Sequence, residues 1–146
     1  MSGRRDIVAA ARAWVGTPYV HQARQRGIGC DCLGLILGLW EEFHGPLPEL
    51  PPAYTADWGE AAGAERLWKA AERYLLPKPL SEAAPGDIVL FRMRDGGVAK
   101  HLGVQSGTDG DARFVHAYSG RGVVESRLTL PWARRIVARF SFPKGS

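Results

Sequence analysis

The spacing of apolar residues changes from a helical to an alternating pattern after about residue 86. Apolar residues recur every three or four positions in three segments, which is the period of an amphipathic helix: 7–15, 32–43 and 60–76. Five later segments alternate apolar with polar residues, as strands do: 87–94, 102–106, 112–118, 123–127 and 136–142. Helices followed by antiparallel strands predict an α+β domain, with N-terminal helices packed on a five- to six-stranded antiparallel sheet.

Glycines and prolines mark where these elements should end. The segment over 32–43 is apolar on nearly all sides, so we expect a buried helix. Gly34 and Gly38 share one face of that helix and would let another element approach closely. The turns at 108–111 and 119–122 have the composition of hairpin connections.

Composition narrows the class of protein without naming a function. A chain of 146 residues, 45% hydrophobic and 23% charged, predicts one soluble domain over residues 1–146. No apolar run approaches the ~20 residues of a membrane span, and Arg12 interrupts the only stretch that resembles a signal peptide. The net charge of +4 is too small to identify a partner, and no nucleic-acid-binding motif is present in the sequence.

The most informative stretch surrounds the two cysteines, Cys30 and Cys32. Asp31 is a good N-cap candidate and would place Cys32 in the first turn of the buried helix. There the unpaired backbone N–H groups and the helix dipole favour a thiolate, and the same N–H groups can stabilise an oxyanion. The alternative is that Cys32 is a small buried hydrophobic residue, as most free cysteines are.

A thiolate nucleophile needs a base, and the base needs a group that orients it. His44 sits at a helix C-terminus, where a structural role suffices. His101 and His116 lie on two consecutive strands, and antiparallel neighbours bring such side chains together when they share a face. The combination with Cys32 therefore favours nucleophilic catalysis.

Four motifs now occur in an order that resembles one known family. They are Gly16-Thr17-Pro18-Tyr19, Asp31-Cys32-Leu33-Gly34-Leu35, Pro85-Gly86-Asp87-Ile88-Val89-Leu90-Phe91 and His101-Leu102-Gly103-Val104. The sequence is similar in these motifs to the NlpC-type cell-wall peptidases, a bacterial and phage branch of the papain-like cysteine peptidases. The resemblance runs from the first expected helix to the last expected strand.

This resemblance implies a set of roles for individual residues. Cys32 would be the nucleophile, His101 the general base and His116 the residue that orients His101, while Tyr19 and Asp31 would contact the oxyanion or substrate. Such enzymes hydrolyse amide bonds in peptidoglycan stem peptides, commonly between D-glutamate and a diamino acid, through an acyl-enzyme. Neither a metal ion nor an organic cofactor is implied.

Two departures from the family pattern bear on specificity and context. Leu33 stands where the family often has Ser, and His21 lies in a segment where it often has Trp and glycines. With Leu33 at this position, the sequence resembles the single-domain members encoded among tail genes of phages and gene transfer agents. That resemblance implies a protein made in the bacterial cytoplasm without a signal peptide, bound to tail hub or tip proteins, and acting in the cell wall or periplasm.

Three other hypotheses remain open at this stage. Cys30 and Cys32 with two of His21, His101 and His116 would supply the ligand types of a zinc site, although Cys-x-Cys is tighter than the usual spacing. A second hypothesis is that the domain is a non-catalytic structural or adaptor part of a tail assembly. A papain-like amidase or acyltransferase would keep the chemistry and change the substrate.

Overall fold

The computed structural model describes residues 4–48 and 65–143, which form helices packed on a six-stranded antiparallel sheet. The strands follow the spatial order β3-β8-β4-β5-β6-β7. Their bounds are β3 (Leu76–Lys78), β4 (Ile88–Arg92), β5 (Ala99–Gly107), β6 (Arg113–Tyr118), β7 (Gly122–Arg127) and β8 (Ile136–Ser141). The expected α+β class and sheet are therefore confirmed.

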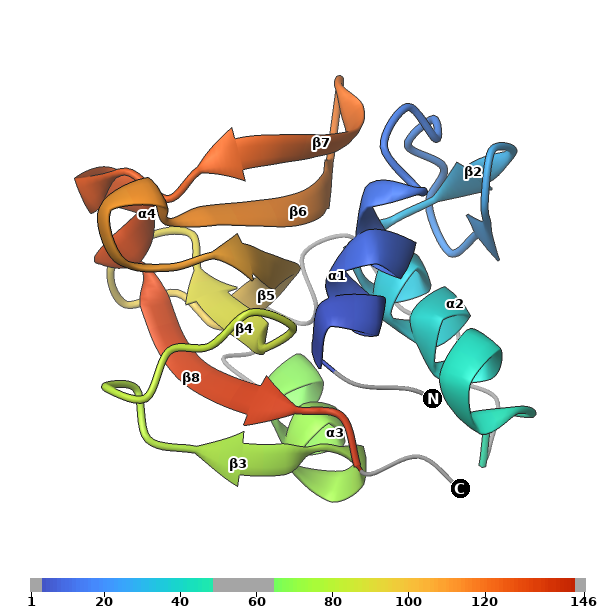
Figure 1. Ribbon diagram of the computed structural model, residues 1–146. Coiled ribbons are helices and arrows are strands. Elements are labelled where there is room, and N and C mark those ends of the chain that lie inside the picture. Colours follow the sequence, from blue (N-terminus) through green and yellow to red (C-terminus); the bar gives the residue numbers. More distant parts are fainter. Residues whose placement is uncertain (1–3, 49–64, 144–146) are drawn as a thin grey trace.

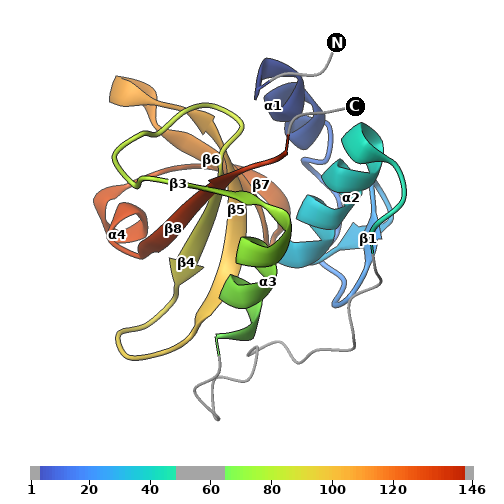
Figure 2. The same ribbon diagram turned by 90° about the horizontal axis from the view of Figure 1, so that it is seen from below.

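The helices cover the two faces of the sheet unequally. Helices α1 (Arg4–Arg12) and α2 (Cys32–His44) lie side by side against one face, with α3 (Arg66–Tyr74) near its β3 end (Figures 1 and 2). The short helix α4 (Leu130–Ala133) lies on the other side of the sheet (Figure 2). A small hairpin of β1 (Arg24–Gln25) and β2 (Gly29–Cys30) precedes α2 and packs against it.

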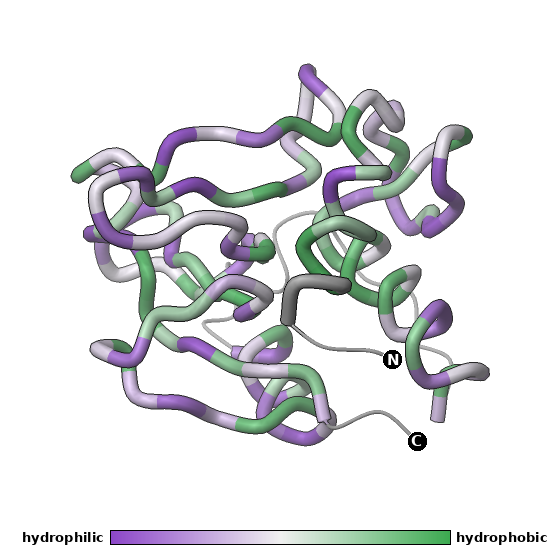
Figure 3. The backbone as a smooth tube through the Cα atoms, in the orientation of Figure 1, coloured by the Kyte–Doolittle hydropathy of each residue, from purple (hydrophilic) through white to green (hydrophobic). Residues whose placement is uncertain are grey.

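Apolar side chains fill the space on both faces of the sheet. The larger cluster joins α1, α2 and α3 to the sheet and includes Leu35, Leu39 and Leu90, none of which is exposed. Figure 3 shows hydrophobic stretches of α1 and α2 where the two helices lie side by side. A smaller cluster beneath α4 contains Phe91 and Phe114. Burial on both faces explains why β4 is apolar at four consecutive positions, 88–91, rather than alternating as expected.

Helix α2 begins and ends where its capping residues predict. The carboxylate of Asp31 accepts a hydrogen bond from the N–H of Gly34 at 2.7 Å, which is an N-cap interaction. Gly45 follows the last residue with a φ of 78°, a conformation that glycine adopts without strain. Gly38 lies so close to the ring of Trp14 that an added Cβ would stand 2.3 Å from it. The predicted close approach at the helix glycines is confirmed.

Several expected boundaries differ from the observed ones. The first helix ends at Arg12 rather than at residue 15. After Arg12 the N–H groups of residues 13, 14, 15 and 17 donate to the carbonyl three residues earlier, and that of Gly16 donates to Val123. The third helix ends at Tyr74, and Pro77 lies in β3, an edge strand where a missing N–H is tolerated. The part of that helix expected over 60–64 lies outside the described residues.

None of the helices in the described part of the chain has the length and apolar character that a membrane span requires.

Candidate active site

Cys32 occupies the first position of α2 and is buried, with 6% of its surface exposed. Its thiol donates to the carbonyl oxygen of Lys100, with 3.8 Å between sulfur and oxygen. The N-cap at Asp31 fixes the start of the helix, so the thiol is held where α2 meets strand β5. The expected position in the first helical turn is confirmed.

Strand β5 is irregular at the point where it approaches Cys32. Phe91 of β4 pairs with His101, but Arg92 pairs with Ala99, so Lys100 is an extra residue on β5. A bulge of this kind bends a strand and redirects its side chains, and bulges are common beside active sites. Here the bulged residue, Lys100, carries the carbonyl that accepts the Cys32 thiol, and the next residue is His101.

The two strand histidines form a direct hydrogen bond. Nε2 of His101 lies 2.8 Å from Nδ1 of His116, and the planes of the two rings are inclined at 81°. The outer nitrogen of His116, Nε2, lies 2.9 Å from the hydroxyl oxygen of Ser126 on β7. Since Nε2 of His101 is engaged with His116, Nδ1 is the His101 nitrogen that can act on a substrate or thiol.

Aromatic rings enclose this pair of histidines. Phe114 stacks on His116 with ring centres 4.1 Å apart. Trp132 of α4 lies 5.7 Å from the ring of His101 and 5.3 Å from that of His116. His101 and His116 are 6% and 1% exposed, so water has little access to the bond between them.

Cys32 and His101 open onto a common cavity of about 230 Å³. The residues lining it come from the segment before α2, from β5 and from the end of β6. They are Tyr19, His21, Asp31, Cys32, Met93, Lys100, His101, Ala117, Tyr118 and Ser119. Among the described residues, His116 does not line the cavity, and its contact with the site is the hydrogen bond to His101.

Burial controls the protonation of the thiol more strongly than the helix terminus does. Burial, with a smaller contribution from the nearby carboxylate of Asp31, raises the pKa of Cys32 to about 12. The backbone N–H groups of Leu102, Leu33 and Cys32 itself lower the pKa, but less. The expectation of a low-pKa thiolate is wrong with the thiol buried in this way, because desolvation of the thiolate raises the pKa more than the N–H groups lower it.

Burial also keeps both histidines neutral. It lowers the pKa of His101 to about 3, with a further contribution from the charge of His116, and it lowers the pKa of His116 to about 4. At neutral pH the site therefore holds a thiol and two neutral imidazoles. A neutral imidazole is a competent proton acceptor, so the arrangement fits general-base activation of the thiol.

Asp31 is engaged within the loop that carries it. One carboxylate oxygen caps Gly34, and the other accepts the N–H of Gln22 at 2.7 Å. Nδ1 of His21 lies 3.6 Å from the second oxygen. Asp31 thus shapes the cavity wall by holding the 19–23 segment against α2, and His21 lines the cavity beside it. Leu33 packs against the larger hydrophobic cluster.

Tyr19 is held beside the cysteine segment by backbone pairing. It forms a parallel bridge with Cys30, and the N–H of Cys30 donates to the carbonyl of Pro18 at 3.0 Å. Burial raises the pKa of Tyr19 to about 12, so its hydroxyl stays protonated and can donate a hydrogen bond into the cavity. That property suits the predicted oxyanion contact.

The zinc hypothesis finds no support in the side-chain positions. Within residues 4–48 and 65–143, no three His, Cys, Asp or Glu side chains are grouped so that they could hold a metal ion. Cys30 is fully buried in the larger hydrophobic cluster and does not line the cavity described above.

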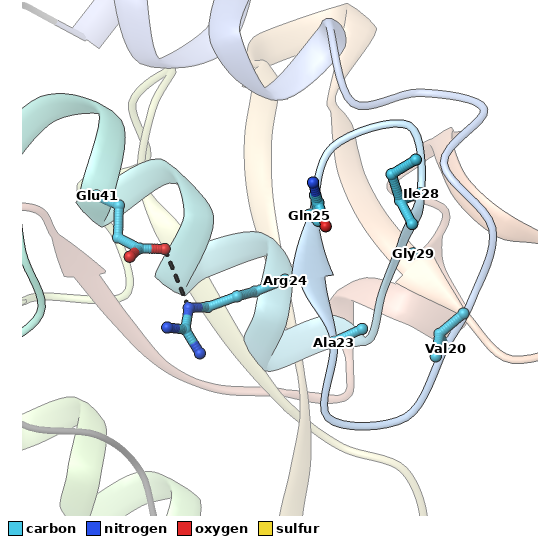
Figure 4. A pocket seen from close by; sticks show the side chains of 7 residues that line it. All are labelled: Val20, Ala23, Arg24, Gln25, Ile28, Gly29 and Glu41. Carbon is cyan, nitrogen blue, oxygen red and sulfur yellow. Dashed lines mark hydrogen bonds and ion pairs between the residues drawn. The ribbon is translucent and has the colours of Figure 1, made fainter.

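A second hollow of about 450 Å³ lies behind the β1–β2 hairpin (Figure 4). Val20 and Ile28 line one side of it, and on the other side Nε of Arg24 lies 3.0 Å from a carboxylate oxygen of Glu41. The described residues that line this hollow include no Cys, Ser or His, and the carboxylate of Glu41 is paired with Arg24.

Several residues at the site were not identified from the sequence. Ser126 and Trp132 contact the histidine pair, and Lys100 forms the bulge. The alternation of β7 opposite His116 was a usable signal for Ser126, because the turn over 119–122 sets the register. Nothing in the local sequence indicated Trp132, which reaches the site from the segment after β7.

The comparisons with known proteins agree with this fold. Residues 16–140 match the model of the NlpC/P60 family, so the chain belongs to that family. The class predicted from the four sequence motifs is thereby confirmed, whereas its assignment to a phage-tail or gene-transfer-agent subgroup stays a prediction.

Individual relatives share the domain at modest identity. The chain is 28% identical over 118 residues to the probable endopeptidase NlpC of Escherichia coli K12, covering 80% of this chain and 63% of that protein. An NlpC/P60 family protein from Bacillus cereus superposes with a TM-score of 0.67 at 18% identity, covering 97% of this chain and 40% of that one. The NlpC/p60 domain of the peptidoglycan hydrolase SagA gives 0.64 at 21% identity, covering 97% and 100%.

Proposed function

We propose that this protein is a cysteine peptidase that hydrolyses an amide bond in peptidoglycan stem peptides. The observation that carries the proposal is that Cys32 and His101 line one cavity while His116 holds the far nitrogen of His101. Membership of the NlpC/P60 family supports the substrate class, since a relative is named as a peptidoglycan hydrolase and another as a probable endopeptidase.

The arrangement accounts for each step of the reaction. The Cys32 sulfur attacks the carbonyl carbon of the substrate amide while its proton passes to Nδ1 of His101. The protonated imidazole then gives that proton to the leaving amine, and a thioester to Cys32 remains. A water molecule, activated by the same nitrogen, hydrolyses the thioester to a carboxylic acid and restores the thiol.

Nearby groups stabilise the charge that develops during attack. The N–H groups at the start of α2 and the hydroxyl of Tyr19 are donors at the cavity wall. Such donors act on the oxyanion in the transition state, and removal of one commonly costs ~10²–10³ in rate. Lys100 lines the cavity, and its positive charge suits a substrate that carries carboxylates, as a D-glutamyl stem peptide does. The Asp31 carboxylate in the same wall already accepts the N–H groups of Gly34 and Gln22.

The direct test is incubation of the protein with peptidoglycan sacculi and with isolated stem peptides, followed by mass spectrometry of the products. We expect a new amine and carboxylate at the bond between D-glutamate and the diamino acid. Cys32→Ala should abolish the product, whereas the matched change Cys30→Ala should keep it, because Cys30 is buried outside the cavity.

Other products would select the alternatives. Cleavage between the glycan and the peptide would indicate an amidase, and acyl transfer to an added amine without hydrolysis would indicate an acyltransferase. Absence of any product, with Cys32 unreactive toward thiol reagents, would indicate a structural or adaptor domain.

We further propose that the protein acts from the tail of a phage or gene transfer agent, held by tail hub or tip proteins, to open the cell wall. This placement is supported by the resemblance of Leu33 and its motif to tail-encoded members. Mass spectrometry of purified particles should detect the polypeptide at tail stoichiometry. Particles free of it would refute the placement without affecting the enzymatic proposal.

A further inference from the structure

Ser126 lies at the outer end of a chain of hydrogen bonds that leads to the cysteine. On the sheet, Ser126 of β7 pairs with Phe114 of β6, two positions from His116 on the same face. Its hydroxyl oxygen is 2.9 Å from Nε2 of His116, whose Nδ1 is 2.8 Å from Nε2 of His101. The chain thus runs Ser126, His116, His101, with the cavity and Cys32 beyond.

Neutral imidazoles can direct this chain in only two ways, since each ring has one N–H donor and one acceptor. In the first, His101 donates from Nε2 to His116, and His116 donates from Nε2 to Ser126. Nδ1 of His101 then has a free lone pair facing the cavity. In the second, the hydroxyl of Ser126 donates to Nε2 of His116, His116 donates from Nδ1 to His101, and Nδ1 of His101 carries the hydrogen. Only the first leaves His101 able to accept the proton of Cys32.

We propose that Ser126 is a positioning residue, which accepts the Nε2–H of His116 and thereby holds both histidines in the tautomers that make His101 a base. The proposal rests on the proposed role of Cys32 as nucleophile. A proton that moves from Cys32 to His101 gives an imidazolium, which keeps donating from Nε2 to His116 without rearrangement of the chain.

The ring of His116 is shielded from water, while Ser126 itself is half-buried. His116 is 1% exposed, Phe114 stacks on its ring, and Trp132 meets that ring edge-on at 5.3 Å between centres. Without the hydroxyl, the first direction leaves the Nε2–H of His116 unpaired, whereas the second leaves only a ring-nitrogen lone pair unpaired. A buried N–H that loses its acceptor carries the larger desolvation penalty, so removal of the hydroxyl moves the balance toward the second direction.

The test measures tautomers and thiol reactivity, neither of which requires the wall substrate. Nitrogen-15 NMR of the two imidazoles distinguishes the Nε2–H from the Nδ1–H form. The rate of Cys32 alkylation by iodoacetamide, located by peptide mass spectrometry, reports activation of the thiol. The variants are Ser126→Ala and Ser126→Thr, with Ser106→Ala as a matched control, because the Ser106 hydroxyl donates to Glu125 instead.

We expect both histidines of the wild type as Nε2–H tautomers, with alkylation about tenfold slower in Ser126→Ala. Ser126→Thr should stay within about twofold of wild type, and Ser106→Ala should be unchanged. Nδ1–H on His116 in the wild type would overturn the proposal even if Ser126→Ala failed to fold. Equal rates in wild type and Ser126→Ala would also overturn it, as would a Thr variant as slow as Ala.

The same readouts separate this proposal from the enzymatic one. If stem peptides stay intact while the tautomers and alkylation rates follow the pattern above, the peptidase function fails and the role of Ser126 stands. If stem peptides are cleaved equally by wild type and Ser126→Ala, the function stands and the role of Ser126 fails.

Discussion

At the level of single residues, the position of a group in the site does not determine its charge. Cys32 begins a helix, which by itself favours a thiolate, yet its burial raises its pKa to about 12. His101 and His116 are buried as a bonded pair that resists protonation. The site at rest is therefore uncharged at Cys32 and the two histidines, and in the proposed mechanism the proton moves only when the substrate is attacked.

This resting state predicts a flat activity profile over the middle of the pH range. With the pKa of His101 lowered to about 3 and that of Cys32 raised to about 12, neither group changes protonation between pH 5 and pH 9 on the order-of-magnitude scale of such shifts. We expect kcat/KM for a stem peptide to be constant there and to fall only toward more acidic pH, where His101 takes up a proton. The alkylation rate of Cys32 should follow the same profile.

A preformed thiolate–imidazolium pair would behave differently. It would give a bell-shaped profile whose acid limb reports thiol protonation and whose alkaline limb reports loss of the imidazolium proton. Two limbs between pH 5 and pH 9 would contradict the uncharged resting state.

At the scale of elements, the cavity depends on the contact between α2 and the segment before it. The carbonyl of Ala23 accepts the N–H of Asp31 at 3.3 Å, directly against Gly34. A Cβ on Gly34 would lie 1.8 Å from that carbonyl oxygen, which no side-chain movement relieves because the neighbour is backbone. Glycine at this position is what lets the loop bearing His21 pack on the start of the helix.

Gly34→Ala should therefore displace the loop and destabilise the fold. We expect the free energy of unfolding to fall by about 3 kcal/mol or more, as overpacking against backbone does. Urea denaturation followed by circular dichroism measures it. Gly110→Ala is the control, since no atom lies within 4 Å of its added Cβ, and should stay within about 0.5 kcal/mol. Equal stability of both variants would refute the packing argument.

A buried ionic network joins the strands at the other end of the sheet. Asp87, which has no exposed surface, accepts from Lys78 at 2.7 Å, from the N–H of Ala84 at 2.8 Å and from Arg139 at 3.0 Å. Arg139 also donates to the side chain of Gln105. The sequence marked Asp87 as part of a family motif, and the structure places it in this network.

Removal of Asp87 should leave the Arg139 charge buried without its partner. We expect Asp87→Ala to lower the free energy of unfolding by about 3–5 kcal/mol. The double variant Asp87→Ala, Arg139→Met should recover part of the loss, because it removes the uncompensated charge. Asp95→Ala, in the exposed turn after β4, is the control. A double variant less stable than Asp87→Ala would contradict this interpretation. Denaturant titration gives all three values.

At the scale of the whole molecule, the buried histidines couple the site to global stability. Both have a pKa below that of an exposed histidine, so the unfolded chain binds protons that the folded chain does not. Stability is then highest above about pH 6.5 and is lost as the pH falls toward about 4 and 3. The catalytic arrangement is therefore maintained at a cost in acid resistance.

This coupling predicts a steep acid-induced loss of stability. Each histidine should contribute about 1.4 kcal/mol per pH unit between its unfolded and folded pKa. We expect the midpoint of thermal unfolding to fall progressively below pH 6.5. His116→Phe should flatten the dependence, because it removes one titrating group while filling the volume between Phe114 and Trp132. An unchanged slope in that variant would count against the assignment.

Much of the fold and half of the site followed from local sequence. Apolar periodicity predicted three helices and five strands near their observed positions, Asp31 predicted the N-cap, and the four ordered motifs predicted the family. These features were predictable because helix period, capping and turn chemistry act over a few neighbouring residues. For the same reason, edge strand β3 was not predicted, and its first residue, Leu76, fell within the helix expected over 60–76: only the pairing of β3 with β8 makes it a strand.

Tertiary structure alone decided the protonation and partners of the reacting groups. The sequence placed Cys32 where N–H groups favour a thiolate, but desolvation by residues distant in the chain reverses that preference. The bond from His116 to Ser126, the cover by Trp132 and the bulge at Lys100 arise from strand register and packing. Burial and register sum contributions from the whole chain, so local patterns located the chemistry, while the assembled fold set its charge state.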